Sequence, residues 1–185
     1  MILPIVAYGD KVLRVECVDI QKDHPGLNEL LDNMFETLYD AEGVGLAAPQ
    51  IGLGIRVFIV DADPFKEDEP GLKDFKKVFI NAKMIEEHGE EWGFKEGCLS
   101  IPGIRENVDR QPKIKISYYD ENFIHQEECF EGLAARVIQH EYDHIDGVLF
   151  IDKINPMKKR MIKGKLADIT KGKVRIHYRM RFPKK

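Results

Sequence analysis

The stretch Leu133-Ala-Ala-Arg-Val-Ile-Gln-His-Glu-Tyr-Asp-His-Ile-Asp146 repeats apolar residues at the period of an α-helix and contains an HExxH pattern, His140 to His144. Positions four apart differ by about 40° around a helix, so both imidazoles face the same way. Two neutral imidazoles at this spacing can bind one divalent metal ion, and Glu141 between them can act as a general base. The stretch therefore predicts a metal-binding helix over residues 133–146.

A third protein ligand would favour a catalytic metal site over two partly exposed histidines on an amphipathic helix. Downstream, the chain offers His177 and several acids, with no second Glu or His at close spacing. Upstream, residues 96–100 read Glu-Gly-Cys-Leu-Ser, a stretch that we predict to be irregular and able to bend back to the helix. Cys98 can bind a metal as a thiolate, so it is the candidate third ligand.

Other regular patterns lie on both sides of this helix. A helix is predicted over residues 25–41, because one apolar stripe has helical spacing: Leu27, Leu30, Leu31, Met34, Phe35 and Leu38. Another is predicted from the N-cap residue Asn155 to about residue 171. Strands are predicted over residues 55–61, 77–87, 113–119, 123–130, 148–151 and 175–182, with a charged surface excursion over 62–75. This order is not a regular alternation, so it predicts an α+β fold with mostly antiparallel sheets around a central HExxH-bearing helix, an N-terminal helix and a C-terminal helix.

Length and composition fit one globular domain. The chain has 185 residues, of which 43% are hydrophobic and 32% charged. It contains neither a long apolar run nor a basic region before its first apolar residues, so we expect no membrane span and no signal peptide. Three cysteines, Cys17, Cys98 and Cys129, argue against a disulfide framework and fit a reducing compartment. A cytoplasmic protein without a membrane partner is expected.

Charge is unevenly distributed along the chain. From Lys158 to the C-terminus there are twelve Lys or Arg residues and one acid, Asp168, although the whole chain has a net charge of −4. Such segregation is typical of a segment that meets an anionic partner such as nucleic acid, and equally of a solvated basic helix face.

Three segments together resemble the signature motifs of one enzyme family. Residues 43–50 read GVGLAAPQ, residues 96–100 read EGCLS and residues 139–144 read QHEYDH. In this order and spacing they resemble the peptide deformylases, and the resemblance extends over about residues 1–170. It implies a catalytic domain over 1–172 that removes the formyl group from the N-terminal formyl-methionine of new polypeptides and releases formate. Residues 173–185 would then form a basic extension, either a strand or an arm.

The resemblance also implies roles for the catalytic residues. Cys98, His140 and His144 would bind one divalent metal ion, with water at the open position. Glu141 would take a proton from that water and return one to the leaving amine. The Gln50 side-chain amide and the Leu99 backbone N–H would hold the negative charge that develops on the carbonyl oxygen.

Substrate contacts follow from the same resemblance. The peptide would lie like an added strand along Gly43, Val44 and Gly45, where glycine lets a backbone approach closely. Three residues would line the methionine pocket: Val44, Leu133 and Val137. Arg105 would touch the bound peptide. Arg136 lies four residues before His140 where the family often has an apolar residue, and it would either form the pocket rim or turn to solvent.

Two partners are implied with less detail. The family's usual ion is Fe2+, with Zn2+, Ni2+ or Co2+ able to occupy the site, and a Cys-His-His set suits iron or zinc. The implied macromolecular partners are N-formylmethionyl nascent peptides, as substrates, and the ribosome. The family is thought to bind the ribosome through a basic C-terminal helix, and residues 155–171 could form that helix here.

Two other functions remain open at this point. An HExxH zinc peptidase normally takes its third ligand downstream, and it leaves the first two motifs unexplained. A ribosome- or RNA-binding protein with a structural metal would explain the basic C-terminal region. A structural site, however, is normally closed by four protein ligands.

Overall fold

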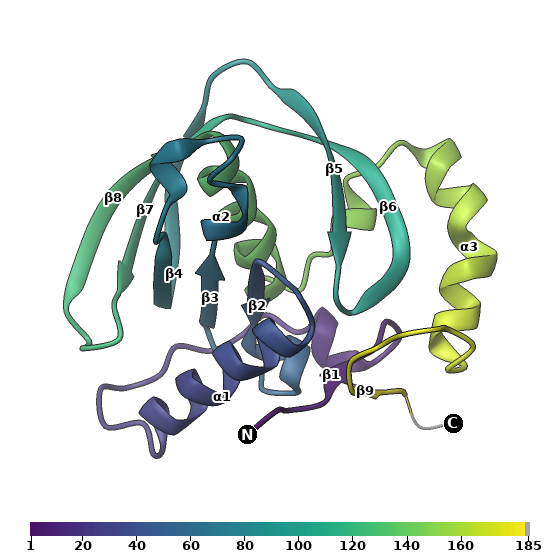
Figure 1. Cartoon of the computed structure of the whole chain (residues 1–185), viewed down its shortest axis with the longest axis horizontal. Coiled ribbons are helices and arrows are strands. Elements are labelled where there is room, and N and C mark those ends of the chain that lie inside the picture. Colours follow the sequence, from purple (N-terminus) through teal and green to yellow (C-terminus); the bar gives the residue numbers. More distant parts are fainter. Residues whose placement is uncertain (184–185) are drawn as a thin grey trace.

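The computed structural model describes residues 1–183 and confirms the predicted α+β fold. Its central element is helix α2 (Gly132–Ile145), which lies between a five-stranded antiparallel sheet and a separate β-hairpin (Figure 1). The Leu133 N–H lies in the first turn, where no helical carbonyl is available to it, and it donates instead to Glu69 Oε1 at 3.0 Å. This carboxylate from the surface excursion therefore caps the helix that carries the HExxH pattern. Within residues 1–183, no helix combines the length and apolar character needed to cross a membrane.

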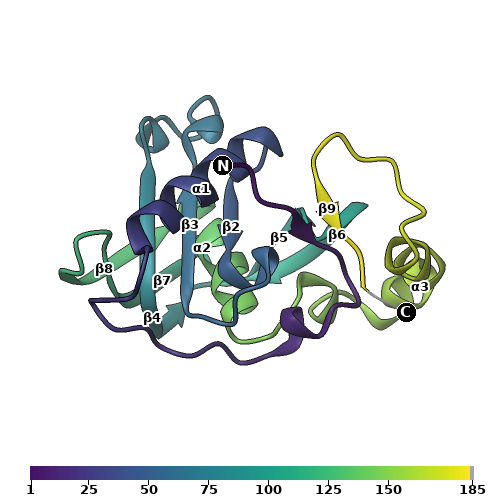
Figure 2. The ribbon, with the colours of Figure 1, turned by 90° about the horizontal axis from the view of Figure 1, so that it is seen from below.

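The large sheet has the order β2-β3-β4-β7-β8, and all its pairings are antiparallel. Its strands are β2 (Gly45–Ala47), β3 (Val57–Asp61), β4 (Lys76–His88), β7 (Lys113–Tyr119) and β8 (His125–Glu131). Alternate residues of β3 pack on opposite faces. Val57 and Ile59 pack in one core cluster with the buried residues of helix α1 (Leu27–Asp40). Phe58 and Val60 pack in another with the buried residues of α2. Helices on both faces explain the uninterrupted apolar run of this strand, and Figure 2 shows α1 on the near side and α2 behind.

The β-hairpin that covers the other side of α2 was not predicted. It consists of β5 (Trp92–Cys98) and β6 (Ile101–Arg110), and Cys98 pairs with Ile101. The prediction of an irregular stretch around Cys98 is therefore wrong, since Cys98 ends a strand and Leu99-Ser100 form its two-residue turn. Side chains two apart on a strand share a face, so Glu96 and Cys98 both point toward α2.

Short 3-10 helices make up much of the remaining chain. They are η1 (Lys11–Arg14), η2 (Ala48–Ile51), η3 (Asp63–Phe65), η4 (Pro70–Leu72) and η5 (Phe150–Asp152). The predicted strand over 148–151 is therefore wrong. Its chain turns instead because the Asp152 carboxylate accepts the Leu149 N–H at 2.9 Å.

The C-terminal region begins with helix α3 (Pro156–Thr170), capped as predicted by Asn155, whose side chain accepts the Met157 N–H at 2.8 Å. Of the strand predicted over 175–182, only β9 (Met180–Arg181) is paired, in parallel with β1 (Ile5–Val6). Over residues 174–182 the alternation persists in burial, with even-numbered residues half-buried and odd-numbered ones exposed. The division into a domain of 1–172 and an extension of 173–185 stays a prediction, and residues 184–185 lie outside the described residues.

Asp152 joins three parts of the chain that are distant in sequence. Its carboxylate pairs with Arg14 of η1 and with Lys159 of α3, at 3.0 Å in the second case, besides the Leu149 N–H. Burial alone would raise the pKa of Asp152, but these three partners outweigh it and lower the pKa to about 2.

Asp152→Asn is expected to lower the free energy of unfolding at pH 7 by about 1–2 kcal/mol, because the folded state stabilises the charged carboxylate. A depressed pKa contributes stability that is complete above the unfolded-state value near 4 and is lost as the pH falls toward 2. Urea unfolding at several pH values should therefore show the difference between the two proteins shrinking between about pH 4 and pH 2. Asp168→Asn, at an exposed position of α3, is the control, and an equal effect there would contradict the role of Asp152.

Candidate metal centre and active site

Three side chains from two elements meet beside the turn of the hairpin. Cys98 ends β5, and His140 and His144 lie one helical turn apart on α2, with one ligand atom of each within 4.8 Å of the others. Cys98 Sγ is 3.3 Å from His144 Nε2. One thiolate and two imidazoles at this separation fit a single divalent ion in size and donor chemistry.

A buried carboxylate fixes the orientation of the first histidine. Glu96 Oε2 lies 2.9 Å from His140 Nδ1, which leaves Nε2 of the ring free for the metal side. Burial alone would raise the pKa of Glu96, but His140 and Arg110 outweigh it and hold the pKa far below its usual range. Burial also lowers the pKa of His144, so this ring stays neutral and able to bind a cation.

Glu96 is held in turn by two arginines. Arg110 binds both of its oxygens, Nε to Oε1 at 2.7 Å and Nη2 to Oε2 at 3.0 Å, and places Nη1 at 2.7 Å from Asp143. Arg136 Nη1 lies 3.0 Å from Oε1 of the same carboxylate. The hairpin and α2 are thus joined by a buried network of charges directly behind His140.

Glu141 follows His140 on α2 and lines the same cleft. Its side chain is 4% exposed, and its Oε2 is a buried atom without a hydrogen-bond partner among residues 1–183. Burial raises the pKa of Glu141 to about 7, despite the opposing charge of His140. A carboxyl group with a pKa near neutrality can both accept and return a proton.

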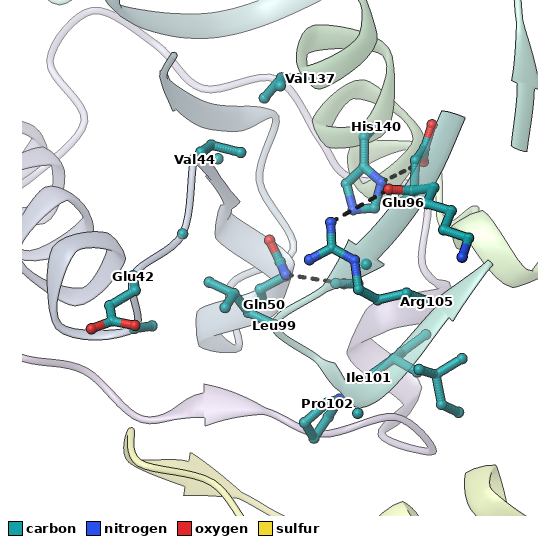
Figure 3. Close-up of a pocket in the computed structure, with 18 of the residues that line it drawn as sticks. Glu42, Val44, Gln50, Glu96, Leu99, Ile101, Pro102, Arg105, Val137 and His140 are labelled. Carbon is teal, nitrogen blue, oxygen red and sulfur yellow. Dashed lines mark hydrogen bonds and ion pairs between the residues drawn. The ribbon is translucent and has the colours of Figure 1, made fainter. Parts of the chain in front are cut away.

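Gln50 approaches the same point from helix η2. Its Oε1 accepts the Ala47 N–H at 2.8 Å, which fixes the amide and turns Nε2 toward the cleft. Nε2 lies 3.5 Å from Cys98 Sγ and 3.4 Å from Ser100 Oγ. Figure 3 shows Gln50 and Leu99 side by side, with His140 and Glu96 across from them. An N–H donor therefore lies beside the ligand atom of Cys98.

These groups lie in an open cleft of about 580 Å³. Most of the predicted site residues line it: Gly43, Val44, Gly45, Gln50, Cys98, Leu99, Arg105, Arg136, Val137, His140 and Glu141. His144 is buried behind them at 1% exposure. Leu133 lies in the core at 7% exposure and is not among the lining residues, so its contact with substrate remains a prediction.

Arg136 does not turn to solvent, and that alternative is wrong. The residue is 2% exposed, and besides Glu96 its guanidinium donates to the carbonyls of Val108 at 2.9 Å and Trp92 at 2.6 Å. It also lies over the Trp92 ring, 4.5 Å from the centroid. The guanidinium is therefore held within the cleft wall, although its Nε has no hydrogen-bond partner among residues 1–183.

The glycines of the first motif leave room for the protein's own side chains. A Cβ atom at Gly45 would lie 2.5 Å from Glu141 Oε1, and one at Gly43 would lie 2.9 Å from Leu99 Cδ1. Glycine is therefore needed at these two positions so that Glu141 and Leu99 can pack closely, whether or not a substrate backbone also approaches there.

Comparison with known proteins identifies the family. The polypeptide deformylase family model matches residues 2–160. The chain belongs to the polypeptide deformylase family. A peptide deformylase from Flavobacterium psychrophilum is 62% identical over the full length of both chains, and one from Christiangramia forsetii is 59% identical over 99% of this chain and 97% of its own. The crystal structure of a peptide deformylase from Legionella pneumophila superimposes with a TM-score of 0.81 at 36% identity, covering 95% of this chain and 99% of that one.

Membership in the deformylase family gives the cleft its chemistry. The chain is a metal-dependent amide hydrolase that removes the N-formyl group from nascent peptides, and its Cys98, His140 and His144 are the metal-binding group typical of deformylases. The family therefore favours this activity over the zinc peptidase and the RNA-binding protein.

Several residues of this deformylase site were missed from the sequence. Glu96 stands in the second motif, and its place two residues before Cys98 would have revealed a shared strand face had the strand been recognised. Arg110 carries no local signal, because only the hairpin register brings it to Glu96. The C-terminal residues 175–178 also line the cleft, which no pattern in the sequence indicates.

Proposed function

We propose that Glu141, Gln50 and Leu99 carry out hydrolysis of the formamide of N-formylmethionyl peptides, beside a divalent ion held by Cys98, His140 and His144. The observation that supports this most strongly is convergence. Glu141, whose Oε2 has no hydrogen-bond partner among residues 1–183, lines the same cleft as the Gln50 amide and the metal ligands Cys98 and His140.

The steps assigned to the protein are proton transfer and charge stabilisation. A divalent ion bound there supplies Lewis-acid polarisation of water and of the formyl carbonyl. Glu141 Oε2 takes a proton from the attacking water and returns it to the peptide nitrogen as the C–N bond breaks, so that formate and a free amine leave. Gln50 Nε2 and the Leu99 N–H donate to the carbonyl oxygen as it becomes negative.

The substrate peptide is placed by the edge of the large sheet. Strand β2 is the terminal strand of that sheet, so the chain at Gly43–Gly45 can accept a further strand through its backbone. Val44 and Val137 stand near each other beside this edge (Figure 3), and Phe65 and Phe94 add to the apolar wall. An unbranched apolar side chain such as methionine fits this surface, and Arg105 lies on the rim toward the following residues.

Product analysis tests this assignment. The metal-containing protein is incubated with formyl-Met-Ala-Ser, and formate and peptide products are measured together. We expect one formate for each intact Met-Ala-Ser. Cleavage of the Met–Ala bond without formate would instead support the peptidase, and absence of both products would contradict an enzymatic role.

For the metal, we propose Fe2+ in the cell. One thiolate and two imidazoles accept both iron and zinc, so the ligand set agrees with the resemblance without distinguishing the two. Metal analysis of protein purified without oxygen should find about one iron per chain, as expected for one three-ligand site. Zinc at that level with little iron would contradict the proposal.

We further propose that α3 brings the enzyme to the ribosome in the cytoplasm, where its substrates arise. Arg160, Lys163 and Lys165 are exposed on this helix and can contact RNA phosphates. Lys163→Glu with Lys165→Glu should weaken sedimentation with ribosomes, whereas Lys83→Glu on the sheet should not. Equal sedimentation of all three proteins would contradict docking through α3.

Gly45→Ala should lower kcat for formate release by about a hundredfold, because displacing a catalytic group by roughly 1 Å has effects of this size. The added Cβ would meet Glu141 at 2.5 Å and force its carboxylate to move. Gly164→Ala in α3, where a Cβ meets nothing within 4 Å, is the control and should leave kcat unchanged. Equal kcat values for both variants would show that Glu141 needs no such close packing.

A further inference from the structure

The chain after α3 returns to the cleft as an arm, which we define as residues 174–182. Arg175, Ile176, His177 and Tyr178 line the cleft, although the family match ends at residue 160. The end of the arm is fixed by β9, where Ile5 N donates to Arg179 O and Ala7 N donates to Arg181 O, both at 2.9 Å. Figure 2 shows β9 beside β1 and close to the hairpin.

Both ends of the chain hold the turn that follows Cys98. The Tyr178 hydroxyl donates to the Leu99 carbonyl at 2.7 Å, and the Tyr8 N–H donates to the Ser100 carbonyl at 2.8 Å. Leu99 and Ser100 are the two turn residues between the paired Cys98 and Ile101, so the strand ladder itself does not fix their peptide groups. The hydrogen bonds from Tyr178 and Tyr8 fix the orientation of these two carbonyl groups instead.

The arm also touches the segment that carries the second donor. Gly52 follows η2 with a φ of +90°, and a Cβ there would lie 2.6 Å from Arg181 Nη2. The guanidinium of Arg181 therefore packs directly on the turn behind Gln50. Both groups assigned to the carbonyl oxygen, the Leu99 N–H and the Gln50 amide, are backed by the same arm.

We propose that Tyr178 is a positioning residue: it holds the Leu99–Ser100 peptide through the Leu99 carbonyl, and so restricts the backbone of Leu99, whose N–H in the preceding peptide is the oxyanion donor. This inference rests on the role proposed above for Leu99. It assigns a function in the reaction to a segment that lies beyond the matched family region. Tyr178 itself touches neither the reacting carbon nor the attacking water.

Tyr178→Phe tests the inference, because it removes the hydroxyl and keeps the ring, which packs against the same core cluster as Leu99. With metal-containing protein and formyl-Met-Ala-Ser, kcat should fall about tenfold, less than the hundredfold or more that follows loss of an oxyanion donor. KM should stay within about twofold, because the lost effect belongs to the transition state. An unchanged kcat, or a change confined to KM, would overturn the inference.

Tyr118→Phe is the matched control. Its hydroxyl donates to Glu128 in the large sheet, so Tyr118→Phe likewise removes one phenol hydroxyl from a hydrogen bond, but far from the Leu99 turn. This variant should lower the melting temperature without lowering kcat. An equal loss of kcat in both variants would reveal a general structural effect and overturn the positioning role. The unmodified protein is assayed beside both variants. If it releases no formate, the proposed function itself is wrong; if it releases formate, the comparison of the variants tests the role of Tyr178 alone.

Discussion

Glu141→Gln is expected to lower kcat for formate release by about a thousandfold, within the range that general acid–base groups contribute. Glutamine has nearly the same shape, so the contact with Gly45 is kept while the proton acceptor is lost. The measurement is steady-state formate release by protein with a verified metal content. KM should change little, because the carboxylate acts through proton transfer in the transition state and is not one of the residues proposed to bind the peptide.

Metal content provides the control for this variant. Glu141 is not one of the three ligands, so Glu141→Gln should retain as much metal as the unmodified protein, whereas Cys98→Ala should lose much of it. A kcat for Glu141→Gln within tenfold of the unmodified value, with metal retained, would show that another group transfers the proton.

Arg110→Met should produce the largest loss of stability. Arg110 is 4% exposed and bridges the buried Glu96 and Asp143, so its removal leaves two carboxylates with fewer partners. Removing one partner of a buried ion pair typically costs about 3–5 kcal/mol. For a chain of this size that corresponds to a melting temperature lower by roughly 10 °C. Thermal unfolding followed by circular dichroism measures it.

Lys66→Met is the matched control for that loss. Lys66 pairs with Asp63 at 2.8 Å, but its side chain is 49% exposed, and such surface pairs contribute little. Its melting temperature should equal that of the unmodified protein. A shift of similar size in both variants would contradict a special role for the buried network around Glu96.

The parts of the fold that the sequence predicts are those with continuous periodicity. The stripe of α1 and the HExxH helix repeat over several turns, and β3 is apolar because it is covered on both faces. The hairpin β5–β6 escaped prediction because its outward residues are charged and three glycines interrupt it. Its strand character comes from pairing, which a linear pattern does not display.

The candidate site divides in the same way. The metal ligands and Glu141 stand in compact motifs, so their types and spacing already indicate chemistry. The groups that orient them do not: Arg110 reaches Glu96 only through the hairpin register, and Tyr178 reaches Leu99 only because β9 pairs with β1 at the opposite end of the chain. The solvent-facing alternative for Arg136 is wrong for a similar reason, since its acceptors on Trp92 and Val108 belong to the unpredicted hairpin.

The central claim is that one divalent ion, bound by Cys98, His140 and His144, is required for removal of the formyl group. It is tested most directly by titration of metal-free protein with Fe2+ in the absence of oxygen, with formate release from formyl-Met-Ala-Ser as the readout. We predict that the rate rises in proportion to added metal and levels off at about one ion per chain, as expected for one three-ligand site. Full activity of the metal-free protein, or no restoration at any level of metal, would contradict the account.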